Sequence, residues 1–419
     1  MRATILAVSS LLLSFSVLCL GHGLNNTLLG LRASYEHFPS WVLGVMMSAY
    51  FLGFIVGTMV CSRLIRTVGQ IRTFAVFASV ASVISLLHVL IISEAAWIVL
   101  RLIYGVCIAG LYMVIESWLN ALAAKEIRGQ VFSIYMTLSF LSLSVGQLFV
   151  FLAQPSEFVL FAVVSILISL ALVPITLSTK QPPNLRQDSE HFGFRRLLVI
   201  SPLATLGCFS TGMTLGAFWG LGAVYYSQIG LTSRAVGLMV GTTFMGGLLF
   251  QWPLGYLSDR FDRRKVIAAT LGVSVFVCAL FVLLVDSMDA ITLPLMGLAL
   301  FFGGFSYTLY SLFITLANDF LEPQHVIKAS GGLIVYHAIG AIFGPTLAAL
   351  SMSAMGSNGL YVFIGLINLL VLLLAARQIY FGRDIPTETM DSFVSFPESS
   401  APALEFDPRS RGETAVNQP

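Results

Sequence analysis

Charge is what this sequence lacks most. Only 10% of its 419 residues are Asp, Glu, Lys or Arg, whereas about 25% is usual in a soluble domain. Apolar residues make up 57% of the chain, and its mean hydropathy is +0.90. A soluble fold must cover much of its surface with polar groups, so this composition excludes an ordinary soluble enzyme. Lipid must be the solvent for most of the chain.

Several other signals are missing. The net charge of +2 and the absence of a basic cluster exclude nucleic-acid binding. The five cysteines are scattered through apolar runs, which fits neither disulfides nor a metal site, so we expect buried thiols. No H-E-x-x-H or G-x-x-x-x-G-K motif occurs, so no metal, cofactor or ATP-driven chemistry is expected. The apolar run after Arg2 lacks a small-x-small cleavage site and is interpreted as a first membrane span.

Long apolar stretches dominate what is present. A helix needs about 20 residues to cross the hydrocarbon layer, and strands of a membrane barrel are much shorter. Cutting the chain at its polar points predicts an all-α membrane protein with twelve transmembrane helices, at residues 4–30, 41–62, 73–93, 96–119, 130–152, 158–178, 197–228, 235–257, 265–286, 291–317, 329–351 and 358–380.

The distribution of bases predicts the orientation. With the N-terminus in the cytoplasm, 19 of the 22 Lys and Arg residues fall on the cytoplasmic side. Only Arg32 and Arg234 fall outside, and Arg101 falls within a span. By the positive-inside rule, both termini are expected in the cytoplasm and the chain in the cytoplasmic, or inner, membrane.

Polar segments divide the chain. Residues 179–196 form the longest interruption before the end, and we interpret them as a cytoplasmic linker between six-helix bundles at 1–178 and 197–380. Residues 381–419 are rich in proline, and from 382 onward seven acidic residues face three arginines, for a net charge of −4. Such a segment cannot bury enough apolar surface to fold alone, so a disordered cytoplasmic tail is expected.

The two halves also match each other. An ungapped offset of 193 residues superimposes the second span of each half, pairing Ser40 with Ser233, Gly44 with Gly237, Met46 with Met239, Phe51 with Phe244 and Gly53 with Gly246. This agreement predicts two copies of one six-helix unit.

One loop carries a family signature. Residues 255–265, GYLSDRFDRRK, resemble the G-x-x-x-D-R-x-G-R-R/K loop of the major facilitator superfamily, with Asp262 where that family has glycine. The equivalent first-half loop keeps Gly69 but has Arg66 in place of the aspartate. Arg101 and Gly105 resemble a second motif of the family, and Gly340, Gly344 and Pro345 resemble its helix-packing glycine-proline motif. Residues 115–117 and 251–253 are most similar to the bacterial YcaD-like branch.

The resemblance implies a secondary transporter, with two bundles rocking about a central site. It implies a small-molecule substrate, coupling to protons and a monomer in the bilayer. For the loop, the resemblance implies a cytoplasmic gate made by Gly255, Asp259, Arg260, Arg263, Arg264 and Arg128. Asp259 can meet Arg128 or the N-terminal end of the fifth span, where the helix dipole is positive. The alternative is that these bases only anchor the topology.

Two charges fall inside the fourth span. Arg101, Gly105, Tyr112 and Glu116 share one face of that helix, and a charge at the bilayer centre costs at least ~2.5 kcal/mol, so the face must point into the bundle. Arg101 and Glu116 are 15 residues apart, or about 22 Å along a helix, and so do not pair. Arg101 is a candidate for holding an anionic group of a substrate. Glu116 either couples transport to protons or pairs with a base in a gate.

Further polar residues complete the predicted pathway. His22 and Asn26 share a face of the first span, and Gln147 and Gln251 fall in spans five and eight, which line the cavity in this fold. His337 in span eleven is a weaker candidate, because interhelical hydrogen bonding explains such residues equally well.

The sequence therefore predicts a transporter of a small organic solute. The polar set favours uptake, whereas the Phe-rich composition favours efflux by a drug/proton antiporter. A sensor or enzyme on the same scaffold is a remote alternative, because neither an output domain nor a catalytic motif is found.

Overall fold

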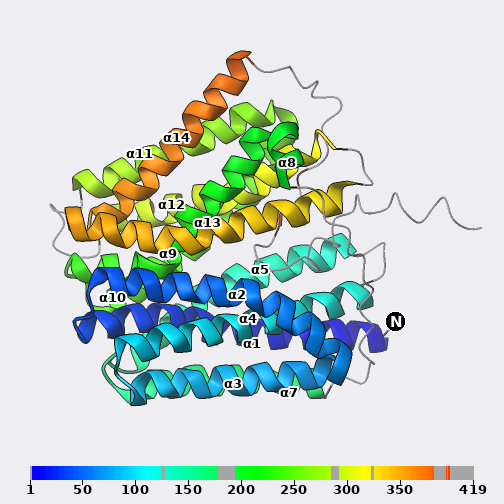
Figure 1. The fold of residues 1–419 in the computed structure, drawn as a ribbon, viewed down its shortest axis with the longest axis vertical. Coiled ribbons are helices and arrows are strands. Elements are labelled where there is room, and N and C mark those ends of the chain that lie inside the picture. Colours follow the sequence, from blue (N-terminus) through cyan, green and yellow to red (C-terminus); the bar gives the residue numbers. More distant parts are fainter. Residues whose placement is uncertain are drawn as a thin grey trace, which may run out of the picture.

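The computed structural model describes residues 2–123, 128–177, 194–284, 292–321 and 325–381, together with Phe393, Ser395 and Phe396. Every regular element in these ranges is a helix (Figure 1). The first half contains α1 (Arg2–Tyr35), α2 (Ser40–Val68), α3 (Gln70–Leu90), α4 (Glu94–Leu122), α5 (Arg128–Gly146), the 3-10 helix η1 (Gln147–Leu152), α6 (Phe158–Leu170) and α7 (Leu172–Thr176). The second half contains α8 (Phe194–Ile200), α9 (Pro202–Gln228), α10 (Ser233–Arg260), α11 (Arg263–Leu284), α12 (Leu293–Asn318), α13 (Val326–Met355) and α14 (Gly359–Phe381).

The predicted multi-span helical fold is confirmed. Within the described ranges, 11 helices are long and apolar enough to cross a membrane. Helix α9, in the seventh predicted range, has 27 residues but is not among them. Its many Gly, Ser and Thr residues are nearly all buried against other helices, so they do not face lipid. Large apolar side chains such as Trp252 and Leu283 are exposed on the outer surface instead, as a lipid-facing surface requires.

Two predicted spans are interrupted where proline intervenes. The range 197–228 breaks at Ser201, because the residue before a proline is driven out of the helical region, and Ser201 has φ −141° and ψ 82°. Helix α6 ends at Leu170, four residues before Pro174, whose ring would clash with the Leu170 carbonyl in a continuous helix.

Close glycine contacts repeat in the two halves. A Cβ atom on Gly53 would overlap the Leu102 carbonyl of α4, and one on Gly246 would overlap the Leu300 carbonyl of α12. Gly53 and Gly246 are a pair of the 193-residue offset, so the second and fourth helices of each half pack through the same small-residue contact.

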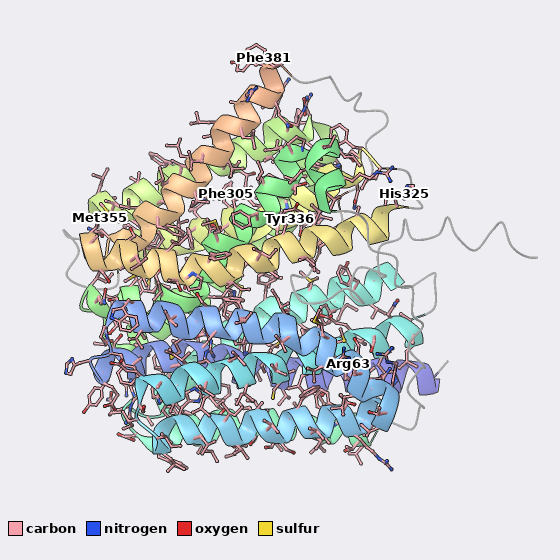
Figure 2. All side chains as sticks on the ribbon, in the orientation of Figure 1. Arg63, Phe305, His325, Tyr336, Met355 and Phe381 are labelled. Atoms are coloured by element: carbon pink, nitrogen blue, oxygen red, sulfur yellow. The ribbon has the colours of Figure 1, made fainter. Side chains whose placement is uncertain are left out.

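The two halves meet mainly at one end of the molecule. We name the end where α1 begins, marked N in Figure 1, the terminal end, and the end where α1 leads into α2 the far end. In Figure 2, Met355 marks the far end of α13 and His325 its terminal end. At the far end α2 packs against α13, and the Ser48 and Thr346 hydroxyls lie 2.8 Å apart.

Helix α5 packs against α10 in the same way. Ser144 donates a hydrogen bond of 2.8 Å to the Gly241 carbonyl, and Gly237 approaches the Gln147 backbone. Gly237 corresponds by the 193-residue offset to Gly44, which touches α13 at Ala349. Equivalent glycines therefore lie in both of these contacts between the halves.

Candidate functional site

Arg101 on α4 is the centre of a buried polar cluster. Its side chain is 0% exposed. Its Nη2 donates a 2.9 Å hydrogen bond to Asn26 Oδ1 on α1 and lies 3.0 Å from Met47 Sδ. The guanidinium carbon stands 4.5 Å from the ring centroid of Tyr50 and 5.7 Å from that of Tyr104. Cation–π contacts and one amide thus surround the charge.

This guanidinium has hydrogen-bonding capacity left over. Its Nε and Nη1 have no hydrogen-bond partner among the described residues. The ion pairs found there join other side chains: Arg32 with Glu36, Arg263 with Asp259 and with Asp319, and Arg264 with Asp262. A buried cation without a carboxylate is costly, so the environment of Arg101 leaves part of its charge uncompensated among the described residues.

His22 joins this cluster from α1. Its Nδ1 lies 3.4 Å from the Tyr104 hydroxyl, and its Nε2 lies 3.3 Å from the Tyr50 hydroxyl. The imidazole also stacks on Trp219 of α9, with centroids 5.5 Å apart. His22 thereby connects the aromatic surroundings of Arg101 in the first half to a helix of the second half.

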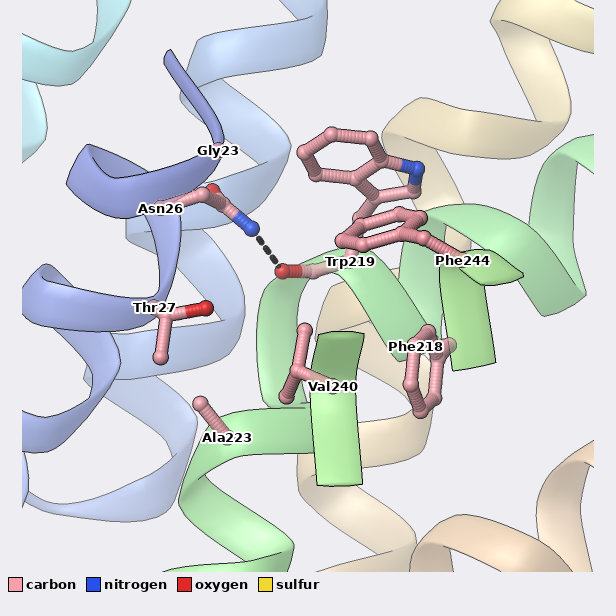
Figure 3. Close-up of a pocket in the computed structure, with 8 residues that line it drawn as sticks. All are labelled: Gly23, Asn26, Thr27, Phe218, Trp219, Ala223, Val240 and Phe244. Carbon is pink, nitrogen blue, oxygen red and sulfur yellow. Dashed lines mark hydrogen bonds between the residues drawn. The ribbon is translucent and has the colours of Figure 1, made fainter. Parts of the chain in front are cut away.

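A small pocket lies where α1, α9 and α10 meet (Figure 3). The Asn26 amide nitrogen donates to the Trp219 carbonyl there, as the dashed line shows. The pocket has a volume of about 10 Å³, and it is lined by Gly23, Asn26, Thr27, Phe218, Trp219, Ala223, Val240 and Phe244. That space suits one water molecule and is too small for an organic solute.

Glu116 lies elsewhere on α4, nearer the terminal end. It is 0% exposed and accepts a hydrogen bond from the Tyr135 hydroxyl of α5. Tyr135 stacks on Phe15 of α1, with centroids 4.2 Å apart. Between the two charges, the Tyr112 hydroxyl lies 3.7 Å from Cys19 Sγ. The predicted face of α4 thus points into the first half, with Tyr112 half-buried, and its charges occupy separate clusters.

The remaining pathway candidates lie apart from Arg101. Gln147 on η1 donates through Nε2 to the Leu143 carbonyl at 3.1 Å. Gln251 is buried ten residues beyond Gly241 on α10, or about 15 Å along the helix. His337 Nδ1 on α13 lies 3.2 Å from the Thr211 hydroxyl of α9, within the second half.

The family loop forms an ion-pair cluster at the terminal end. The Arg263 side chain is fully buried and pairs with the equally buried Asp319 at the end of α12. Asp259 Oδ1 accepts from Arg263 Nη2 at 3.3 Å and from the Phe393 N–H at 2.7 Å. The described partners of Asp259 lie in the second half and at Phe393, and the predicted contact of Asp259 with Arg128 or the start of α5 stays a prediction. The Arg128 side chain lies outside the described residues. Arg260 stacks over Tyr256, 4.3 Å from the ring centroid.

Asp262, the departure from the family loop, has a local role. Its Oδ1 accepts from the Arg264 N–H at 3.0 Å, which caps α11, and its Oδ2 lies 2.9 Å from Arg264 Nη2. Partial burial opposes ionisation, but the hydrogen bonds and charge of Arg264, with the charge of Lys265, hold the pKa of Asp262 below its usual value. At the equivalent position Gly69 has φ 87°, which favours glycine.

The other motif glycines bring helices together. A Cβ atom on Gly105 would overlap the Tyr50 carbonyl, so α4 and α2 touch beside Arg101. Gly340 and Gly344 on α13 approach the backbone of α9 equally closely, and Pro345 stands inside α13 where α2 crosses it.

Sequence reasoning missed the aromatic partners of both charges. Tyr50 and Tyr104 lie against Arg101, and Tyr135 donates to Glu116. Trp219 stacks on His22, and Asp319 pairs with Arg263. Only Asp319 had a signal of its own, as an acidic residue two positions after a predicted span.

Comparison with known proteins agrees with this architecture. The Major Facilitator Superfamily profile matches residues 11–232 and 204–401. The uncharacterized MFS-type transporter YcaD of Escherichia fergusonii is 27% identical over 380 residues, covering 90% of this chain and 96% of that protein. A mutant of the nucleoside transporter NupG has a TM-score of 0.74 at 11% identity, covering 88% of this chain and 99% of that one. A bacterial homolog to the human lysosomal transporter Spinster, inward-facing and occupied, has a TM-score of 0.71 at 13% identity, covering 90% and 98%.

Fold and sequence therefore define a multi-pass helical membrane protein built from two related halves. The chain belongs to the Major Facilitator Superfamily, and is accordingly a secondary transporter and not an enzyme.

Proposed function

We propose that this transporter moves a small organic solute with an anionic group, and that Arg101 binds that group. The observation that carries the proposal is the fully buried guanidinium with two nitrogens unpartnered among the described residues. Oxygens of a carboxylate or phosphate can accept from these groups and supply the missing counter-charge. Tyr50, Tyr104 and His22 provide an aromatic surface for the organic part of the solute.

Asn26 links this binding to movement. Its carbonyl oxygen accepts from Arg101, and its amide nitrogen donates to the Trp219 carbonyl of the second half. An anion that competes for Arg101 withdraws one of the bonds that orient Asn26, and so weakens the contact between α1 and α9. Occupancy of the site thereby favours separation of the halves at the far end.

We further propose that the halves, residues 1–178 and 197–380, rock as rigid bundles joined by the linker 179–196, most of which lies outside the described residues. With both termini in the cytoplasm, the far end faces outward and the structure represents a state closed to the outside. The contacts of α2 with α13 and of α5 with α10 support this assignment.

Glu116 is our proposed proton-coupling group. It is fully buried, and the Tyr135 hydroxyl stabilises its oxygen, so binding a proton changes the bond between α4 and α5. Glu116 would bind the proton in a symporter and in an antiporter alike. A drug/proton antiporter remains the alternative to uptake, and its substrate would also have to satisfy Arg101.

The anion proposal is tested by ligand stabilisation. Purified protein is heated with organic acids, sugars, amino acids and cationic dyes at constant ionic strength, since a ligand that binds the native state raises its melting temperature. We expect stabilisation by organic anions in the wild type and at least about tenfold weaker binding in Arg101→Gln, the effect of one charge-assisted hydrogen bond. Equal stabilisation of both proteins by the same anion would refute the role of Arg101.

Proton coupling is tested separately in proteoliposomes. A pH gradient should drive accumulation of the stabilising anion in the wild type but not in Glu116→Gln, while exchange between equal pools persists in both. Undiminished gradient-driven accumulation in Glu116→Gln would exclude this residue as the coupling group.

A further inference from the structure

Three residues beyond α14 return to the transporter at its terminal end. Phe393, Ser395 and Phe396 lie in the range expected to be a disordered tail, the rest of which lies outside the described residues. Phe396 is only 2% exposed and belongs to the same buried cluster as Tyr310 and Phe313 of α12. This part of the tail therefore packs as core.

Backbone hydrogen bonds fix the segment at two points. The Phe393 N–H donates to Asp259 Oδ1 on α10 at 2.7 Å, and the Phe396 N–H donates to the Ser311 hydroxyl on α12 at 2.9 Å. The Phe393 ring occupies the space that a side chain at Gly255 would fill. Gly255 and Asp259 are one helical turn apart, so together they form a binding position for Phe393.

This binding position lies in the family loop, residues 255–265. Asp259 is the residue from which a latch to the first half is expected, and here its carboxylate is bound to the tail and Arg263. The sequence of the tail from residue 382 onward carries a net charge of −4, whereas residues 260–265 contain four bases. The opposite net charges of the two segments favour their approach.

We propose that Phe393 and Phe396 of the tail form an intramolecular lock that holds the transporter open at its terminal end. While it occupies Gly255, Asp259 and Ser311, these groups are not available to the first half. The segment must leave before that end closes and the far end opens. This inference rests on the proposed rocking of the two halves, because the lock acts by stabilising one of its states.

The test uses a cysteine reporter at the far end. Ser48→Cys is introduced into the full-length chain, and its rate of reaction with a membrane-impermeant thiol reagent is measured. The five native cysteines are all buried, so the background is low. Removing the lock with Phe393→Ala and Phe396→Ala should raise the labelling rate at least about fivefold, the lower end of usual coupling between sites. Phe406→Ala, in the same tail, is the matched control and should label as the parent does.

A peptide provides the reverse experiment. A chain truncated after Arg383 should label as fast as the double phenylalanine variant. Adding a peptide of residues 388–399 should slow it again, whereas the peptide with both phenylalanines replaced by alanine should not. Labelling of the double variant at the rate of Phe406→Ala would overturn the lock.

Asn26→Ala separates the two proposals. It removes the contact with Trp219 and should raise far-end labelling whether or not the tail acts. A response to Asn26→Ala without a response to the tail variants refutes only the lock. If neither change alters labelling, the proposed rocking of the halves fails as well.

Discussion

Two fully buried arginines in this protein should differ strongly in how the same substitution changes the stability of the protein. Arg263 is paired with the buried carboxylate of Asp319, whereas Arg101 has no described carboxylate. Removing one partner of a buried ion pair costs about 3–5 kcal/mol, because the other charge is left uncompensated. Arg263→Met should therefore strongly destabilise the protein.

Arg101→Met should be nearly neutral or stabilising. The substitution removes one charge-assisted hydrogen bond to Asn26, about 1.5–3 kcal/mol, and a cation–π contact with Tyr50, about 0.5–2 kcal/mol. It also abolishes the desolvation cost of the cation, which is several kcal/mol. These contributions approximately cancel, so the two variants should differ by about 3 kcal/mol or more.

The assay is thermal unfolding of both variants in one detergent without ligand. Combining Arg263→Met with Asp319→Asn should recover part of the lost stability, since the stranded charge is then removed. If Arg101→Met unfolds at as low a temperature as Arg263→Met, Arg101 belongs to an ion pair that stabilises the fold. In that case the reasoning that makes Arg101 an anion site would be refuted.

Three further predictions concern helix packing, helix capping and opening of the far end. Gly246→Val should impair folding and yield because it overlaps the Leu300 carbonyl, whereas Gly272→Val, with open space around it, should be tolerated; comparable yields would contradict the close packing of α10 and α12. Asp262→Ala should lower thermal stability by about 1 kcal/mol through loss of the α11 cap. The pKa of Asp262 in the folded protein is lowered from 3.8, so the stability difference between wild type and Asp262→Ala should be complete above pH 3.8. The difference should fade as the pH falls through the lowered pKa. A stability difference that persists unchanged at low pH would argue against the ionised cap. A disulfide between Ser48→Cys and Thr346→Cys should stop transport reversibly, and unimpaired transport by the cross-linked protein would show that the far end need not open.

The helices were predictable from hydropathy for two reasons. The bilayer sets their length, and the backbone N–H and C=O groups of each apolar run must form hydrogen bonds within that run. The predicted helix boundaries were less accurate where proline or packing between helices affects the chain. Pro174 and Pro202 break two spans, and α9 survives as a long buried helix although its hydropathy is low, since other helices replace lipid around it.

The site was only partly predictable. The period of a helix places Arg101 and Glu116 on an inward face, but it does not say which side chains of other helices meet them. Tyr50 and Trp219 reach Arg101 and His22 through packing of α2 and α9, which no local pattern encodes. The docking of Phe393 and Phe396 was equally hidden, because two phenylalanines in a polar segment show no periodicity.

The most direct test of the account is flux of an organic anion through proteoliposomes. The anion that stabilises the purified protein is loaded on one side, and its movement is compared for wild type and Arg101→Met at matched protein content. The account predicts saturable flux through the wild type and loss of that flux in a variant that remains folded. Flux of the same anion through Arg101→Met at the wild-type rate, or transport only of neutral and cationic solutes by the wild type, would contradict it.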